Sequence, residues 1–196
     1  MAYTNDYQAI TGLSKVYIAV QQQDTKEGVK YGQVHVVDSP KSFGVTPESS
    51  LDKAHAGNRV VQVAQTRAGT TFNMSFHSLP DELQEEILGE ERREDGLTYS
   101  NSKHVSPYLG IIAEFTKEDG TSRFVGLTKA VLTPAAEEGS TKEDSTEFGE
   151  LAFEGEAMER IFDGERKISK SSKDEDYDFS VLSAAVFMDS AAMPEA

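Results

Sequence analysis

The residues that indicate the fold most clearly are TTFNMSFH, numbers 70–77, in which polar and apolar side chains alternate. In an extended chain Phe72, Met74 and Phe76 fall on one side, and the polar residues between them fall on the other. This two-residue period is typical of a strand with one buried and one exposed face. The stretch therefore predicts an antiparallel sheet that covers a core on one side.

The sequence on both sides of this stretch predicts a mainly β protein. Further strands are expected at 13–20, 34–37, 58–67, 108–117, 123–133 and 148–158, with a turn at 118–121. Polar segments at 48–57, 90–106 and 167–176 predict loops, and 177–187 fits either a strand or a helix. Strands that follow one another without alternating helices favour an antiparallel β-sandwich or barrel.

One flanking α-helix is expected at about residues 79–89. Apolar residues recur there at helical spacing, namely Leu79, Leu83 and Ile87. Ser78 is expected to cap the first turn together with Asp81, in the pattern of a capping box. Gly89 is expected to end the helix.

The charge excludes several classes of partner. Asp and Glu number 34 against 19 Lys and Arg, so the net charge is -15. Such a surface repels phosphate backbones and anionic membranes, which argues against a nucleic-acid groove or a polybasic membrane anchor. No cysteine is present, so disulfides and thiolate chemistry are excluded. The first ten residues lack the features of a secretory signal, and no apolar run approaches the roughly 20 residues of a membrane span.

The sequence offers little that could carry catalysis. It contains no phosphate-cradling glycine motif and no nucleophile elbow, and its four histidines are far apart. Asp174, Asp176 and Asp178 alternate as in a calcium loop, but Phe179 and Ala185 stand where that loop needs Gly and Glu. We assign no catalytic, metal or cofactor-binding residue and expect a protein that is not an enzyme.

Several segments, in this order, carry a resemblance to a known family. They are GLSKVYIA at 12–19, the helix 79–88 closed by Gly89, PYLG at 107–110, GLTKA at 126–130 with its basic Lys129, and TKEDSTEF at 141–148. Together they resemble the major tail tube proteins of long-tailed, non-contractile bacteriophages of Gram-positive hosts. The strand at 123–133 lacks the Trp that many relatives have.

This resemblance implies a structural virion protein. Members form a β-sandwich with a flanking helix, and six copies close into rings that stack into the hollow tail tube for DNA ejection. The implied partners are further copies of the chain, a tape-measure protein, a tail terminator and a distal tail or baseplate protein, with no membrane and no cofactor. The implied location is the virion tail, after assembly in the host cytoplasm. We expect a flexible arm at 1–11, one tube domain at 12–188 and a tail at 189–196.

Two hypotheses link the sequence to this function. Glu150, Glu154 and Glu156 fall on one face of the strand at 148–158 and are candidates for acids that line the lumen and repel DNA. That face could equally be the outer surface of the tube. Neighbouring copies could complete each other's sheets, and the polar segments 1–11, 48–57 and 90–106 could order on stacking.

Other functions remain open from the sequence. A monomeric β-sandwich that acts as a binding or adhesion module would have similar composition and strand pattern. A jelly-roll hydrolase with two catalytic acids is a third reading, since acidic residues are abundant. Tube subunits of contractile tails and of type VI secretion systems share the implied fold.

Overall fold

The computed structural model describes residues 8–56, 58–93, 95–99, 103–133, 150–173, 178–188 and 190. Strands account for most of this part of the chain. In order, the elements are β1 (Ile10–Thr25), β2 (Gly28–Tyr31), β3 (His35–Val37), β4 (Pro40–Ala56), β5 (Arg59–Phe76), α1 (Asp81–Leu88), β6 (Glu91–Arg92), β7 (Thr98–Tyr99), β8 (Tyr108–Lys117), β9 (Ser122–Thr133), β10 (Leu151–Ala157), β11 (Lys167–Ser171) and α2 (Phe179–Val186).

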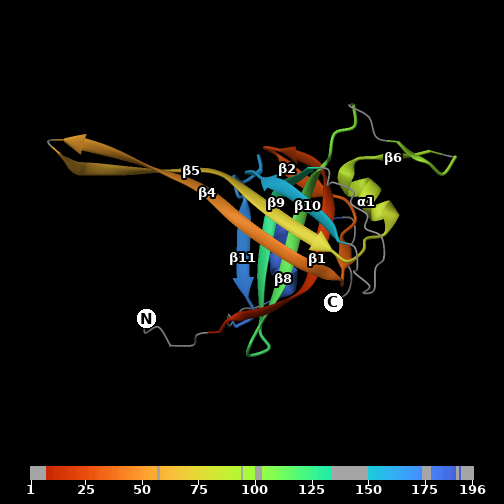
Figure 1. Cartoon of the computed structure of the whole chain (residues 1–196). Helices are drawn as coiled ribbons and strands as arrows, with labels where there is room; N and C mark the ends of the chain where they lie inside the picture. Colours follow the sequence, from red (N-terminus) through yellow and green to blue (C-terminus); the bar gives the residue numbers. More distant parts are fainter. Residues whose placement is uncertain are drawn as a thin grey trace, which may run out of the picture.

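Nine of these strands form one antiparallel sheet, shown in Figure 1. Its order is β2-β1-β8-β9-β10-β5-β4, with β3 paired to β1 and β11 paired to β9. Strands β6 and β7 form a separate small hairpin. The hairpin expected around the turn at 118–121 is confirmed as β8 and β9, in which Thr116 pairs with Ser122.

The sheet folds over so that its two halves face each other across the main core. Phe43 of β4 contacts Phe115 of β8, with ring centroids 6.2 Å apart. Phe72, Met74 and Phe76 are buried in the same core, as their alternation predicted. The predicted fold, a mainly β protein with an antiparallel β-sandwich and a flanking helix, is therefore confirmed.

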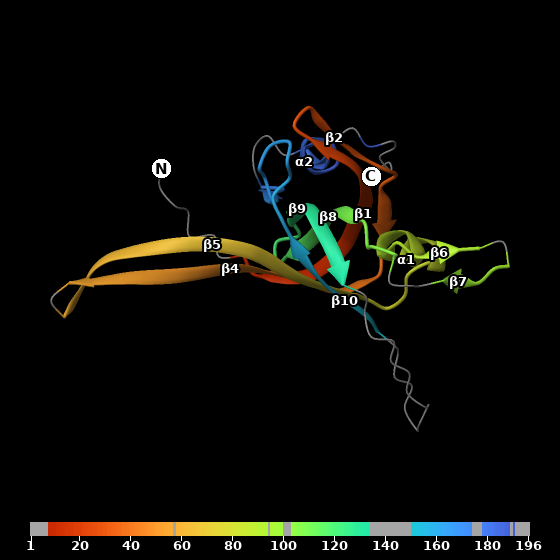
Figure 2. The ribbon, with the colours of Figure 1, turned by 90° about the horizontal axis from the view of Figure 1, so that it is seen from above.

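A second core lies on the other face of β1, β8 and β9, under α2 (Figure 2). Alternation along β1 serves both cores, because Val16 and Ile18 enter the main core while Tyr17 and Ala19 enter the second. These central strands are buried on both faces. They form a rigid body from which other elements extend.

Helix α1 lies where the sequence predicted it, but its first turn differs. The predicted cap by Ser78 is wrong, because Pro80 occupies the N-cap and no side chain caps the helix. A residue before proline avoids helical angles, so Leu79 cannot belong to the helix and Ser78 lies too far from its first turn. Gly89 does end the helix, in a left-handed conformation at φ 71°.

Two predictions for the C-terminal part of the chain are corrected. Residues 167–171, expected in a loop, form β11, because backbone pairing with β9 compensates for a polar sequence. The ambiguous stretch at 177–187 contains α2, so the described residues hold two helices where one was expected. Asp178 caps α2 by accepting a hydrogen bond from the Ser180 amide at 2.8 Å.

The loop predicted at 48–57 is also wrong, because residues 48–56 belong to β4. They pair with β5 as far as Ala56, which lies opposite Arg59. Asn58, directly before Arg59, has φ 59°. Both faces of this ribbon meet solvent, so the sequence had no reason to alternate there.

The segment at 90–106, also expected to be a loop, contains the short hairpin β6–β7. Asp95 holds its turn together by accepting hydrogen bonds from the Leu97 amide at 3.0 Å and the Tyr99 hydroxyl at 2.8 Å.

Candidate assembly surfaces

A long two-stranded arm extends from the body of the protein (Figure 1). β10 pairs with β5 only from Thr70 to Phe76, so beyond that point β5 pairs with β4 alone. We define the arm as residues 49–65. Two-stranded hairpins are at best marginally stable in water on their own, so an arm of this length indicates a surface that a partner covers.

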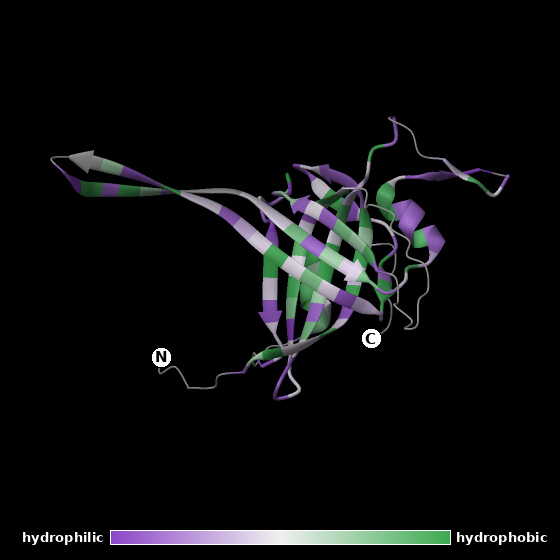
Figure 3. Cartoon of the chain, viewed as in Figure 1, coloured by the Kyte–Doolittle hydropathy of each residue, from purple (hydrophilic) through white to green (hydrophobic). Residues whose placement is uncertain are grey.

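The arm exposes large apolar side chains, and its ribbon carries both hydrophobic and hydrophilic residues, green and purple in Figure 3. The large apolar side chains are Leu51 at 60%, Val60 at 46%, Val61 at 54% and Val63 at 51% exposure. A bulge between Ala54 and His55 leaves Val61 without a partner across the ribbon. Apolar residues gathered on an exposed element mark an interaction site more often than scattered ones do.

A second candidate surface is the outer face of the sheet half formed by β4, β5, β10 and the end of β9. Along this face Glu154 pairs across the strands with Asn73 and Thr133. Glu156 pairs in the same way with Thr71. A shallow hollow of about 590 Å³ lies over these residues. We call this surface the polar face.

The structure supports the alternation predicted for the strand at 148–158. Glu154 and Glu156 are exposed on the polar face, whereas Phe153 and Ala157 are buried in the main core. Glu150 directly precedes β10 and forms an ion pair with Lys41 of β4. The hydrogen bond from Lys41 holds the pKa of Glu150 below its ordinary value.

A third feature is the loop at 158–166, which bonds to one buried ion pair at the end of the sheet and contains a second ion pair itself. The first pair joins Lys129 Nζ of β9 to Asp24 Oδ2 of β1 at 2.7 Å, and both side chains are less than 10% exposed. Asp24 also accepts hydrogen bonds from the backbone amides of Ile161 and Phe162. Burial acts to raise the pKa of Asp24, but these hydrogen bonds outweigh burial and lower it.

Arg160 provides the second ion pair of this loop. It is 1% exposed and pairs with Asp163, whose pKa it lowers. Its guanidinium also donates to the carbonyls of Ala185 and Val186 at the end of α2, each at 3.1 Å. Arg160 therefore fastens the loop to the end of α2.

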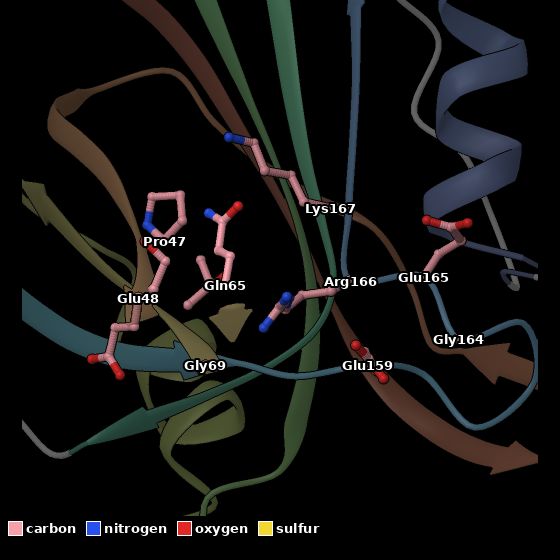
Figure 4. A pocket seen from close by; sticks show the side chains of 11 residues that line it. Pro47, Glu48, Gln65, Gly69, Glu159, Gly164, Glu165, Arg166 and Lys167 are labelled. Atoms are coloured by element: carbon pink, nitrogen blue, oxygen red, sulfur yellow. The ribbon is translucent and has the colours of Figure 1, made fainter. Parts of the chain in front are cut away.

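A crevice of about 510 Å³ separates this loop from the root of the arm (Figure 4). Pro47, Glu48 and Gly69 line it on the arm side. Glu159 and Arg166 line it on the loop side. Both signs of charge meet there, and no described side chain fills the space.

The described part of the chain contains no cluster of metal-ligating side chains. No group of three or more His, Asp or Glu side chains there could hold a metal ion. His35 and His104 lie beside Glu86 and Glu91 respectively, in separate places. Asp174 and Asp176 lie outside the described residues. Neither described helix is long and apolar enough to cross a membrane.

Comparison with known families decides among the open functions. Residues 9–194 match the model of a family described as phage tail tube protein. The chain belongs to this family. No match is found among curated protein sequences. The resemblance drawn from the segments between 12 and 148 is thereby confirmed for the tail tube family.

Membership places this tail tube protein among the structural proteins of the phage tail. The family is not a family of enzymes. It implies self-assembly into a tube together with other tail proteins. The arm, the polar face and the crevice are therefore surfaces of a protein that binds copies of itself.

Sequence reasoning missed two parts of these surfaces. Lys129 stood out only as a basic residue within a family motif, and its buried partner Asp24 lies 105 residues away. Arg160 gave no signal beyond its position before the Asp163-Gly164 turn. The arm did have a signal, because Gly-Asn at 57–58 between two extended segments is typical of a tight hairpin.

Proposed function

We propose that six copies of this tail tube protein close into a ring and that stacked rings form the tube of a long, non-contractile tail. DNA leaves the capsid through its lumen. The observation that carries this proposal is the polar face, a sheet surface with acids outside and the main core directly beneath. A conduit for DNA needs an inner wall that is rigid and does not bind phosphates.

The free edge of β4 supports closure into a ring. β4 ends the order of the sheet, and its outer edge pairs with no described strand. Exposed strand edges favour pairing with another chain, and a contact repeated by rotation closes into a ring. A neighbouring copy that adds to β4 would continue the polar face around the lumen.

Glu154 and Glu156 are the acids we place in the lumen wall. Both are exposed on the polar face, and no ion pair to either is found among the described residues. Glu150 contributes less repulsion in this proposal because Lys41 pairs with it. Negative charges along the wall would keep DNA from adhering while it passes.

The remaining partners follow from the same proposal. A tape-measure protein sets the length of the tube, a terminator closes one end, and a distal tail or baseplate protein starts the other. Residues 12–188 are proposed to form the tube domain, with 1–11 and 189–196 as flanking segments, the first of which already contains the start of β1 at Ile10. Assembly takes place in the host cytoplasm before the tail joins the virion.

Charge reversal on the polar face tests the lumen. Phages carrying Glu154→Lys and Glu156→Lys should assemble tails but eject DNA more slowly, with a rate that rises with salt. Glu27→Lys and Glu118→Lys, exposed acids away from this face, are the matched control and should eject normally. Ejection by the lumen variant at the control rate would contradict the placement of this face.

The number of copies per ring and the position of the polar face can be measured directly. Electron cryomicroscopy of purified tubes should show six copies per ring, with the polar face inside. A different number, or the polar face outside, would contradict the corresponding part of the proposal.

A further inference from the structure

The loop at 158–166 presents an apolar surface that is partly open to solvent. Ile161 is 55% and Phe162 40% exposed, and they are adjacent in sequence. Tyr108, 43% exposed, is linked to them through Lys129, whose Nζ is 4.6 Å from the Tyr108 ring centre and bonded to Asp24, the acceptor of their amides. We call Tyr108, Ile161 and Phe162 the loop patch.

The loop patch is held rigidly, although it faces solvent. Asp24 accepts from the amide of Ile161 at 3.0 Å and from that of Phe162 at 3.3 Å. Arg160, the residue before them, donates from its side chain to Asp163 Oδ1 at 3.0 Å and from its backbone amide to the Glu165 carbonyl at 3.1 Å. A surface ordered before binding loses little entropy on binding, so this arrangement favours a docking site.

The arm has the properties of the matching surface. It exposes Leu51, Val61 and Val63, and large apolar residues elsewhere on the described body stand singly, such as Val105 and Val181. Residues 49–56 span about 26 Å at about 3.3 Å per residue, and the arm points away from its own body (Figure 1). An arm therefore meets the patch of another copy rather than its own.

Charge favours the same pairing. The arm carries Lys53 and Arg59 against Asp52. The loop at 158–166 carries exposed Glu159 and Glu165 close to the patch. The chain as a whole has a net charge of -15, whereas the arm has one more positive than negative residue. The charge of the arm is therefore complementary to that of another copy.

We propose that the arm of one copy binds the loop patch of a second copy. Val61 and its apolar neighbours cover Ile161 and Phe162, while Lys53 and Arg59 face Glu159 and Glu165. The crevice at the arm root adjoins the loop at 158–166. A neighbouring arm that covers the loop patch can therefore extend its contact into this crevice. This inference rests on the proposed assembly into tubes and names the surfaces that meet.

Paired cysteines test the contact, because the native chain has none. A chain with both Val61→Cys and Phe162→Cys should form disulfide-linked ladders when tubes are oxidised. Ladders rather than dimers are expected because each copy joins a different copy at each of its two sites. Val61→Cys combined with Val181→Cys on α2 is the matched control and should give few cross-links.

The outcomes separate this inference from the proposed function when the same samples are viewed by electron microscopy. Tubes without ladders, or with no more cross-linking than the control, would overturn the arm–patch contact alone. Dimers of the single Phe162→Cys variant within tubes would also overturn it, because patch would then meet patch. Native chains that never form tubes would contradict the proposed function and this inference together.

A second variant tests the contact without new bonds. Phe162→Ser should raise the concentration needed for tube assembly by about tenfold, since a large apolar contact is lost. Its midpoint of thermal unfolding as a monomer should fall only slightly, because Phe162 is 40% exposed and lies outside both cores. Val181→Ser should leave assembly unchanged, and an equal effect of both variants would contradict the proposal.

Discussion

At the scale of single residues, the ion pair of Asp24 and Lys129 joins two strands, β1 and β9, across 105 residues of sequence. Both side chains are buried, and the carboxylate also accepts two backbone hydrogen bonds from the loop at 158–166. A buried charge that loses its partner is costly, whereas an apolar replacement of both partners can be nearly neutral. The pair is therefore sensitive to single changes and tolerant of a double one.

Lys129→Met should destabilise the monomer by about 3–5 kcal/mol, because it leaves Asp24 buried and unpaired. Asp24→Asn combined with Lys129→Met should recover part of that loss. Urea unfolding of the native chain, both single variants and the double variant measures the coupling. Additive losses would show that the two side chains stabilise the fold independently.

The pKa values of Asp24 and Asp163 predict a loss of stability in acid. Both are lowered in the folded protein from an ordinary value of 3.8. Their contribution is therefore fully present above about pH 4 and is lost as the pH falls toward the folded-state values. Urea unfolding between about pH 5 and pH 2 should show this decline, and Asp24→Asn should make it shallower. An unchanged slope in that variant would exclude Asp24 as a cause.

At the scale of elements, α1 ends where only glycine fits well. Gly89 has φ 71°, and a Cβ there would lie 2.6 Å from the Val105 carbonyl oxygen. Gly120 has φ 78° in the β8–β9 turn, but a Cβ there would meet no atom within 4 Å. The two positions share a left-handed backbone and differ in the space around it.

Gly89→Ala should therefore cost more than Gly120→Ala. The left-handed backbone alone costs roughly 1–2 kcal/mol with a Cβ, and the contact with Val105 adds to that at Gly89 only. Unfolding free energies of the two variants measure the difference. Equal costs would mean that the chain around Val105 moves away without loss.

At the scale of the whole molecule, the net charge of -15 opposes assembly. Copies repel one another, and salt screens this repulsion over a Debye length of about 10 Å at 0.1 M. Apolar contacts such as those we propose between arm and loop patch do not weaken in the same way.

Tube assembly should accordingly need less protein as the salt concentration rises from about 0.05 to 0.3 M. Replacing Glu154 and Glu156 by Gln removes two negative charges and should weaken this dependence on salt. Sedimentation of tubes at several salt concentrations measures both effects. Assembly that weakens with salt would show that ion pairs between copies outweigh the general repulsion.

The sequence by itself determined those parts of the protein whose environment differs between their two sides. Residues 70–77 alternate because one face meets the core, and the same reason exposes Glu154 and Glu156. Leu83, Ile87 and Gly89 indicated a helix because spacing and backbone conformation are local properties. The family could be recognised because such local segments occur in a characteristic order.

Only the tertiary structure decided the arm, the strand β11, and the ion pair of Asp24 and Lys129. Residues 49–54 are exposed on both faces, so their strand depends on backbone pairing with β5, which leaves no alternation in the side chains, and only Gly-Asn at 57–58 indicates the hairpin. Asp24 and Lys129 are 105 residues apart and meet only because β1 and β9 flank β8 in one sheet. The contacts that organise the candidate assembly surfaces are long-range, and sequence periodicity reports only on neighbours along the chain.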